Sequence, residues 1–259
     1  MILSDIIKSK RAYIEQAKKD TSLEYLKHRF LRKNIKTRNF KLAISQSRDI
    51  NIIAEIKQAS PTRGIIRKDF DVRKIAIEYQ INGASAISVL TDGEFFKGDL
   101  KYIKEVKAVT SLPVLRKDFI IDEYQVYESA LYGADAILLI TDILSKEEIS
   151  KFSSLAKSLD MAVLCEAHSE GEIEKAISAK QDIIGINNRD LGTFKLSLST
   201  TENLIGLIPG GKIIVSESGI HSRADVMFLK SIGVSAVLVG EALMEAEDVG
   251  AKLRELTGR

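Results

Sequence analysis

The sequence predicts an α/β protein: a single (β/α)8 barrel of the TIM-barrel type with an N-terminal helical extension. Three stretches share a glycine, two small or polar residues and an aliphatic run, namely NGASAISVL from residue 82, YGADAILLI from 132 and IGVSAVLVG from 232. Glycine suits the left-handed position that ends a helix, and a continuous aliphatic run is typical of a strand buried on both faces. Each stretch therefore predicts a helix followed by a parallel strand.

The remaining chain completes the series of strands. Eight candidate strands start at residues 51 (NIIAEIK), 85 (SAISVLT), 113 (PVLRKDF), 136 (AILLI), 162 (AVLCEA), 183 (IIGINN), 212 (KIIVSES) and 236 (AVLVG). Their starts lie roughly 21 to 34 residues apart, which is room for one strand and one crossover helix. Helical patterns such as DVRKIAIEYQING fill the gaps. An open doubly wound sheet is the alternative, but KQASPTRG after the first strand is not its G-x-G-x-x-G fingerprint.

The domain organisation follows from the same series. Residues 1–48 read as one or two amphipathic, basic helices, an extension rather than a ninth unit, and residues 49–259 form the barrel. No Gly/Ser/Pro-rich linker interrupts the chain, so we expect one domain overall. The basic helices favour solvated faces over an RNA-binding arm.

Composition narrows the class of protein. The chain is 45% apolar and 29% charged with a net charge of +2, which gives no reason to expect nucleic acid or a membrane as a partner. The single cysteine, Cys165, excludes an internal disulfide and fits a reducing compartment. The first residues become charged too soon for a signal peptide, and no apolar run approaches the roughly 18 residues of a membrane span. We expect a cytoplasmic protein.

Polar side chains gather at one end of the predicted strands, where the active site of such a barrel lies. Alternate strand residues share a face, so Glu55 and Lys57 point into one space. Five strands end in such groups, namely Glu55 and Lys57, Lys117 and Asp118, Glu166, Asn187 and Arg189, and Glu217 and Ser218. Burying one unpaired charge is costly, so the set predicts a mutually compensating cluster around a polar ligand. The alternative is a set of structural ion pairs that closes the mouth of the barrel.

Two glycines predict a phosphate site. SESGI ends the seventh strand and VGEAL the eighth, each with an apparent helix start after the glycine. Backbone N–H groups at such positions bind anions, and these two loops are the usual phosphate site of the fold. Gly219 and Gly240 would let the backbone approach the phosphate; the alternative is that each only makes a tight turn.

Other residues carry weaker signals. Lys117, among the apolar neighbours of LRKDF, is a candidate general acid or a lysine that reaches the rim. His168 is a further catalytic candidate, but three histidines without ligand spacing make a metal site unexpected. Cys165 alternates with Glu166 and is expected to pack against a helix. Phe96, Phe119 and Leu191 either wall an apolar pocket or pack in loops.

These residues make the chain resemble the indole-3-glycerol phosphate synthase family. The matching stretches are AEIKQASPTRG, SVLTDGEFFKG, LRKDFIIDEYQVYESALYGADAILLI, CEAHSEGEI, GINNRDLGTF, SESGIHSRADV and LVGEALM, between about residues 51 and 245. The N-terminal helices also look like those of this family. Seven ordered matches at strand ends are highly specific.

The resemblance implies a carboxy-lyase of tryptophan biosynthesis. It would close 1-(2-carboxyphenylamino)-1-deoxyribulose 5-phosphate to indole-3-glycerol phosphate with loss of CO2 and water, without cofactor or metal. The oligomeric state stays open between a monomer and a homodimer. By motif, Lys117 looks like the general acid, Glu166 like the catalytic carboxylate, and Glu55 with Lys57 like the pair that serves the dehydration. The orienting residues would be Asn187, Arg189, Glu217 and Ser218. Phosphate would be held by Ser60, Gly219, Gly240 and Glu241, and the aromatic ring by Phe96, Phe119, Leu138 and Leu191.

The chemistry adds two expectations. An acid for ring closure needs a pKa near the working pH, so we expect Lys57 and Arg189 to lower that of Lys117 by repulsion. Glu241 stands where some members of the family have serine, so its side chain contributes nothing to binding a dianion. The division of roles between Glu55 and Glu166 stays open. The rival families are phosphoribosylanthranilate isomerase, which has a catalytic cysteine on the first strand, and a catalytically silent barrel whose helices bind RNA or a protein.

Overall fold

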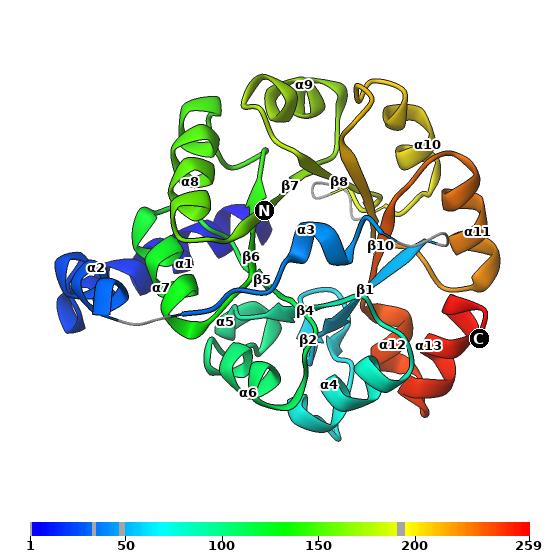
Figure 1. Cartoon of the computed structure of the whole chain (residues 1–259), viewed down its shortest axis with the longest axis horizontal. Helices are drawn as coiled ribbons and strands as arrows, with labels where there is room; N and C mark the ends of the chain where they lie inside the picture. The colour runs from blue at the N-terminus through cyan, green and yellow to red at the C-terminus, as the bar shows by residue number, and fades with distance from the viewer. Residues whose placement is uncertain (1, 33–34, 47–49, 191–194) are drawn as a thin grey trace.

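Eight parallel strands close into a barrel in the computed structural model, which describes residues 2–32, 35–46, 50–190 and 195–259. Around the barrel the strands follow the order β1-β10-β9-β8-β7-β6-β5-β4, so each crossover joins neighbours (Figure 1). The strands are β1 (Asn51–Ile56), β4 (Ala86–Leu90), β5 (Val114–Lys117), β6 (Ala136–Ile140), β7 (Ala162–Ala167), β8 (Ile183–Asn187), β9 (Ile213–Glu217) and β10 (Ala236–Val239). The predicted barrel is confirmed.

Helices surround the barrel as an outer ring (Figure 1). They are α4 (Val72–Ile81), α6 (Lys101–Val109), α7 (Glu123–Tyr132), α8 (Lys146–Ser158), α9 (Glu170–Ser178), α10 (Ser199–Ile205), α11 (Arg223–Ser231) and α13 (Val249–Thr257). The glycines of the three repeated junctions, Gly83, Gly133 and Gly233, all have φ between 89° and 99°. They adopt the left-handed conformation that ends a helix without a steric penalty, as the pattern predicted.

Short elements follow the carboxyl ends of three strands. A hairpin of β2 (Ala59–Ser60) and β3 (Gly64–Ile65) follows β1, where the sequence indicated only a loop. The helices α5 (Gly93–Phe96) and α12 (Glu241–Glu245) follow β4 and β10. Elements of two to five residues carry too little periodicity to be recognised in a sequence.

The alternation of strand side chains divides the interior into two cores. Outward residues such as Ile52, Ile137 and Cys165 pack against the ring of helices. Inward residues form a second core inside the barrel, to which Ile53, Leu115 and Leu164 belong. Toward the carboxyl ends, the inward positions change from aliphatic to charged side chains. A packed barrel therefore supports a polar cavity at one end only.

In residues 2–32 and 35–46, three helices precede the barrel: α1 (Ile2–Asp20), α2 (Leu23–Arg32) and α3 (Phe40–Ala43). Phe40 and Ile44 belong to the core inside the barrel, so α3 closes its amino-terminal end, where Figure 1 shows it crossing in front. α1 lies toward the opposite end and buries Ile6, Lys10 and Ile14. Because the extension contributes to the barrel core, we expect residues 1–48 and 49–259 to fold as one domain. None of the described helices is long and apolar enough to cross a membrane.

Candidate active site

A cavity of about 170 Å³ opens at the carboxyl-terminal end of the strands. Every residue that the family resemblance assigns to the site lies on its wall, except Leu191, which is outside the described residues. His168, the further catalytic candidate, is not among the residues that line the cavity. The lining thus includes Glu55, Lys57, Ser60, Phe96, Lys117, Phe119, Leu138, Glu166, Asn187, Arg189, Glu217, Ser218, Gly219, Gly240 and Glu241. Sequence positions from 55 to 241 are brought together because the eight strands deliver their last residues to one mouth.

The first strand supplies an ion pair across one residue. Lys57 Nζ lies 2.8 Å from Glu55 Oε1, and both side chains are largely buried. The two charges point into the same space, as strand alternation predicts. Their proximity permits proton transfer between one acid and one base held on a rigid element.

Lys117, at the end of β5, forms the centre of the cluster. Its Nζ lies 2.5 Å from Glu166 Oε2 and 3.0 Å from Glu217 Oε2, with only 15% of the side chain exposed. Burial alone would lower the pKa of Lys117, but the carboxylates of Glu166, Glu217 and Glu55 outweigh it. The pKa of Lys117 is therefore raised well above its ordinary value.

This overturns the expectation that neighbouring cations depress the pKa of Lys117. The two cations expected to repel it are each neutralised by a carboxylate: Lys57 pairs with Glu55, and Arg189 Nη2 donates to Glu241 Oε2 at 2.9 Å. Lys117 is thus an ammonium ion at neutral pH, held between carboxylates. The sequence showed which charges share the mouth but not which of them are neighbours.

The two carboxylates that flank Lys117 differ in protonation. Burial raises the pKa of Glu166, but Lys117 and His168 outweigh burial and lower it to about 2. Burial and the charge of Glu166 raise the pKa of Glu217 to about 7, against the attraction of Lys117. Glu217 Oε1 is buried and has no hydrogen-bond partner among the described residues. One carboxyl is therefore a fixed anion, whereas the other can carry a proton near neutral pH.

Amide and guanidinium groups complete the polar wall. Asn187 Nδ2 donates to Glu166 Oε1 at 3.1 Å, which orients that carboxylate. Glu241 receives Arg189 at 2.9 Å and Arg63 at 2.5 Å, so it joins the end of β8 to the β2–β3 hairpin. The side chain of Glu241 therefore has a structural role, because it holds two guanidinium groups at the edge of the cavity.

The two glycines predicted to bind phosphate have different conformations. Ser218 and Gly219 both have left-handed backbones, with φ of 67° and 77°. The following helix begins only at Arg223, so Gly219 lies in a loop rather than at the helix start that the sequence indicated. The φ of Gly240 is ordinary at −122°, but a Cβ there would collide with the carboxylate of Glu55. Gly240 thus makes room for Glu55, a reason that the sequence did not reveal.

Apolar groups line the remaining wall. The rings of Phe96 and Phe119 lie 6.1 Å apart at 34°, and Leu138 projects from β6 into the same cavity. Ser60 Oγ accepts a hydrogen bond from the backbone N–H of Arg63, which shapes the hairpin beside the charged end. The cavity thus has an aromatic side and a charged side.

Helix α1 contributes residues that sequence reasoning missed. Ile2, Leu3 and Ile6 border the cavity. In the next turn, the ammonium of Lys10 lies 2.7 Å from Asp92 and 2.8 Å from Asp118, with 6% of its side chain exposed. A charged residue within the apolar i, i+4 stripe Ile6–Lys10–Ile14 was the available signal, because a lysine in a buried stripe needs a carboxylate partner.

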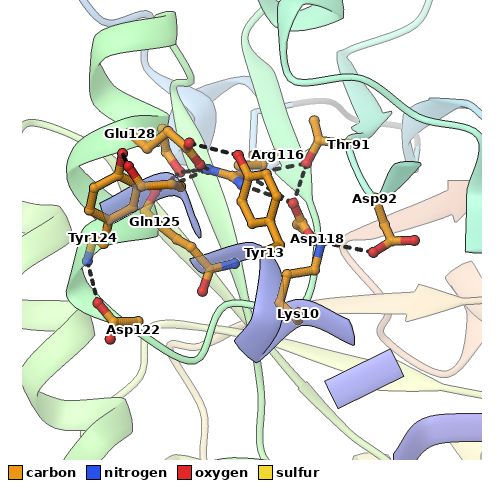
Figure 2. A network of polar contacts seen from close by, with 12 residues as sticks. Lys10, Tyr13, Thr91, Asp92, Arg116, Asp118, Asp122, Tyr124, Gln125 and Glu128 are labelled. Carbon is orange, nitrogen blue, oxygen red and sulfur yellow. Dashed lines mark hydrogen bonds and ion pairs between the residues drawn. The ribbon is translucent and has the colours of Figure 1, made fainter. Parts of the chain in front are cut away.

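A buried network anchors this helix, as Figure 2 shows. Arg116 bonds Asp118 at 2.9 Å and Glu128 at 2.9 Å, and Thr91 donates to Asp118 at 2.6 Å. Tyr13 of α1 donates to Glu128 at 2.9 Å. Arg116 and Asp118 flank Lys117 on the opposite face of the same segment. The buried network on the face opposite Lys117 therefore holds the end of β5 in place.

Additional lining residues come from loops and strand ends without a distinctive pattern. They are Pro61, Thr62, Leu90, Ile140, Ile220, His221, Leu238 and Val239. Asp118, one of the polar strand-end residues named from the sequence, also borders the cavity. Cys165 is fully buried among the helices, so it cannot serve the cavity as a nucleophile. No group of three or more His, Cys, Asp or Glu in the described part of the chain could hold a metal ion.

Known proteins with similar sequences show to which family this chain belongs. The family model for indole-3-glycerol phosphate synthase matches residues 3–256. The chain belongs to the indole-3-glycerol phosphate synthase family. Curated synthases of that name include one from Acetivibrio thermocellus, 47% identical over 98% of each chain. Another, from Thermoanaerobacter, is 50% identical over 96% of this chain and 94% of its own.

More distant solved structures share the barrel. Thiamine phosphate pyrophosphorylase from Pyrococcus furiosus is 16% identical, with a TM-score of 0.59, over 80% of this chain and 93% of its own. The 3-hexulose-6-phosphate synthase from Salmonella typhimurium is also 16% identical, with a TM-score of 0.61, over 81% and 97%. At this identity the likeness concerns the fold alone, and indole-3-glycerol phosphate synthase activity is the one that family membership indicates.

Proposed function

We propose that this carboxy-lyase converts 1-(2-carboxyphenylamino)-1-deoxyribulose 5-phosphate into indole-3-glycerol phosphate in the cavity, with Lys117 as its general acid. The observation that carries the proposal is the buried ammonium of Lys117 between Glu166 and Glu217. A cation fixed in this way supplies a proton and a positive charge where negative charge develops on the substrate oxygen.

The charged and aromatic sides of the cavity define how the substrate lies. The anilino ring packs against Phe96, Phe119 and Leu138, and the phosphate lies near the loops of Ser218, Gly219 and Gly240. Arg63 and Arg189, both held by Glu241, provide positive charge at that end. This orientation brings the carbonyl carbon of the sugar chain to the charged centre, a gain from positioning alone.

Ring closure is the first step. The ring carbon that bears the carboxylate attacks the carbonyl carbon, the carbonyl electron pair moves to oxygen, and Lys117 gives its proton to that oxygen. Its high pKa keeps the proton on nitrogen until the oxygen becomes basic. Loss of CO2 then restores the aromatic ring, and the electron pair of the broken bond returns to it.

Dehydration completes the reaction. The hydroxyl formed from the carbonyl leaves as water after protonation, and a carboxylate removes a proton from the adjacent methylene carbon, so that the carbon–carbon double bond of the indole ring forms and the nitrogen keeps its hydrogen. Glu166, ionised and oriented by Asn187, serves as the base. The Glu55–Lys57 pair, or Glu217 in its protonated form, supplies the acid.

A fluorescence assay tests the proposal. The carboxyphenylamino-deoxyribulose phosphate is added to the wild-type protein, and indole fluorescence is expected to appear. Lys117→Met should lower kcat by about 10²- to 10⁴-fold, the range expected for a general acid. Lys151→Met on α8, whose side chain is 61% exposed, is the matched control and should keep full activity. Absence of product from folded wild-type protein would refute the assignment.

A further inference from the structure

His168, directly after β7, has no role in the reaction proposed above, although it lies against the catalytic cluster. Its side chain is 11% exposed. Nδ1 lies 3.2 Å from Glu172 Oε2, and Nε2 lies 3.5 Å from Glu166 Oε1. The imidazole therefore stands between the carboxylate proposed as base and a second carboxylate on α9.

The second carboxylate is firmly fixed. Glu172 Oε2 accepts hydrogen bonds from Thr141 Oγ1 at 2.8 Å and from the backbone N–H of His168 at 3.0 Å. Ser169 Oγ donates to Glu172 Oε1 at 3.1 Å. With Nδ1–H directed at Glu172, the ring has one orientation, and this orientation turns Nε2 toward Glu166.

The position of Nε2 is unusual for a structural histidine. Nε2 is buried and has no hydrogen-bond partner in the described part of the chain. Its distance of 3.5 Å from Glu166 Oε1 is an ion-pair contact rather than a hydrogen bond. Buried polar nitrogens are normally paired, so an unpaired one aimed at a catalytic carboxylate indicates an electrostatic role.

We propose that His168 is a positioning residue, an imidazolium that serves Glu166 as a second cationic partner beside Lys117. The inference rests on the proposed function, in which Glu166 is the base. The groups that act on the imidazole are Glu166 on β7, Glu172 on α9 and, farther away, Glu217 on β9. The nearby ammonium of Lys175 is occupied by the carbonyl oxygens of Thr141 and Leu144.

The protonation of His168 agrees with this geometry. Burial lowers the pKa of His168, but the carboxylates of Glu172 and Glu166 outweigh it, so the pKa is raised above 6.5. The positive charge is present below the raised pKa and is lost as the pH rises through it.

The reaction explains why a second cation matters. When Lys117 gives its proton to the substrate oxygen, it becomes a neutral amine and no longer balances Glu166. The imidazolium of His168 takes no part in that transfer and keeps its charge. Glu166 thus remains ionised and able to accept the methylene proton in the later dehydration.

Proton NMR of the full-length protein tests the pairing directly. The three imidazoles, of His28, His168 and His221, are assigned by single substitutions and titrated. His168 should titrate above 6.5, and Glu166→Gln should lower its pKa by about one unit. The proton chemical shifts of His28, which is exposed on α2, should be the same in wild type and Glu166→Gln at pH 7 and serve as the control. An unchanged pKa of His168 in Glu166→Gln would overturn the proposal, and this readout needs no substrate.

Kinetics test the consequence. His168→Asn should lower kcat about tenfold at pH 7 with KM within about twofold. The ratio of wild-type to variant kcat should shrink as the pH passes the pKa of His168. His28→Asn is the control, and His168→Gln replaces the variant if thermal unfolding shows that His168→Asn is unfolded. Equal kcat values for wild type and variant overturn the proposal, whereas an inactive wild type refutes the proposed function instead.

Discussion

Two lysines in this molecule are buried between pairs of carboxylates, one on α1 and one on β5. Lys10 lies 2.7 Å from Asp92 and 2.8 Å from Asp118, and Lys117 lies 2.5 Å from Glu166 and 3.0 Å from Glu217. The carboxylates around Lys10 also receive other donors. Asp118 accepts from Arg116 and Thr91, and Asp92 accepts from the backbone N–H of Phe95 at 2.9 Å.

The carboxylates around Lys117 are less completely paired. Glu217 leaves one oxygen without a hydrogen-bond partner among the described residues, and its pKa is raised to about 7. No buried atom of the Lys10 network (Lys10, Tyr13, Thr91, Asp92, Arg116, Asp118 and Glu128) is unpaired in this way in the described structure. A buried cation thus stabilises the fold where every oxygen of its carboxylate partners is hydrogen-bonded. Where a partner oxygen is left unpaired, the cation and its partners can take part in proton transfer.

Removing each ammonium is the strongest test of this comparison. Lys10→Met should lower the free energy of unfolding by about 3–5 kcal/mol, because it leaves Asp92 and Asp118 buried without their shared cation. Lys117→Met should lower it much less at pH 7, because Glu217 can take up a proton instead. Urea unfolding at pH 7 measures both. Equal losses for the two variants would show that the networks do not differ.

Displacing the Glu217 side chain should have a smaller effect than removing either lysine, and it tests the same difference between the two networks. A Cβ at Gly185 on β8 would collide with the Glu217 carboxylate, so Gly185→Ala should displace it. We expect kcat to fall about tenfold and the free energy of unfolding to fall by about 1–3 kcal/mol, the usual effect of overpacking. Gly171→Ala on α9 is the control, because its Cβ meets no atom within 4 Å. Unchanged kcat in Gly185→Ala would mean that the position of Glu217 is unimportant.

The pH dependence of stability sharpens the comparison further. The pKa of Glu217 is raised from 4.5 to about 7, so its contribution to stability is full below pH 4.5 and is lost as the pH rises through 7. Wild-type stability should therefore carry a falling component of at most about 1.4 kcal/mol per pH unit in this window. Glu217→Gln should remove that component, as measured by urea unfolding from pH 4.5 to 8. A variant with the same slope as the wild type would contradict the assigned titration.

The sequence was most informative where a simple period governs structure. Each strand begins within one residue of its predicted start, and alternation placed Glu55 and Lys57 on one shared face and Cys165 on the face opposite Glu166. It failed where three-dimensional neighbours decide the property. The raised pKa of Lys117 depends on Glu166 and Glu217, 49 and 100 residues away, and the role of Gly240 depends on Glu55. No local sequence pattern shows which distant residues become neighbours in space, so the protonation states of the side chains at the mouth could not be predicted.

The sequence predicted helices at the N-terminus, but it did not predict where α1 packs on the barrel, for the same reason. Its i, i+4 stripe indicates a buried face but not the surface that covers it, and the apolar roof of Ile2, Leu3 and Ile6 was therefore missed. The partner of that face is the network behind β5, which the stripe does not encode. Lys10 carried the only hint, a charge at a position where burial demands compensation.

The docking of α1 also imposes an order of assembly during synthesis. Tyr13 and Glu128 are 115 residues apart, so the first helix leaves the ribosome long before its binding surface exists. Contacts of such long sequence separation form late in folding. The apolar roof of the cavity can therefore be put in place only after β5 and α7 have been translated.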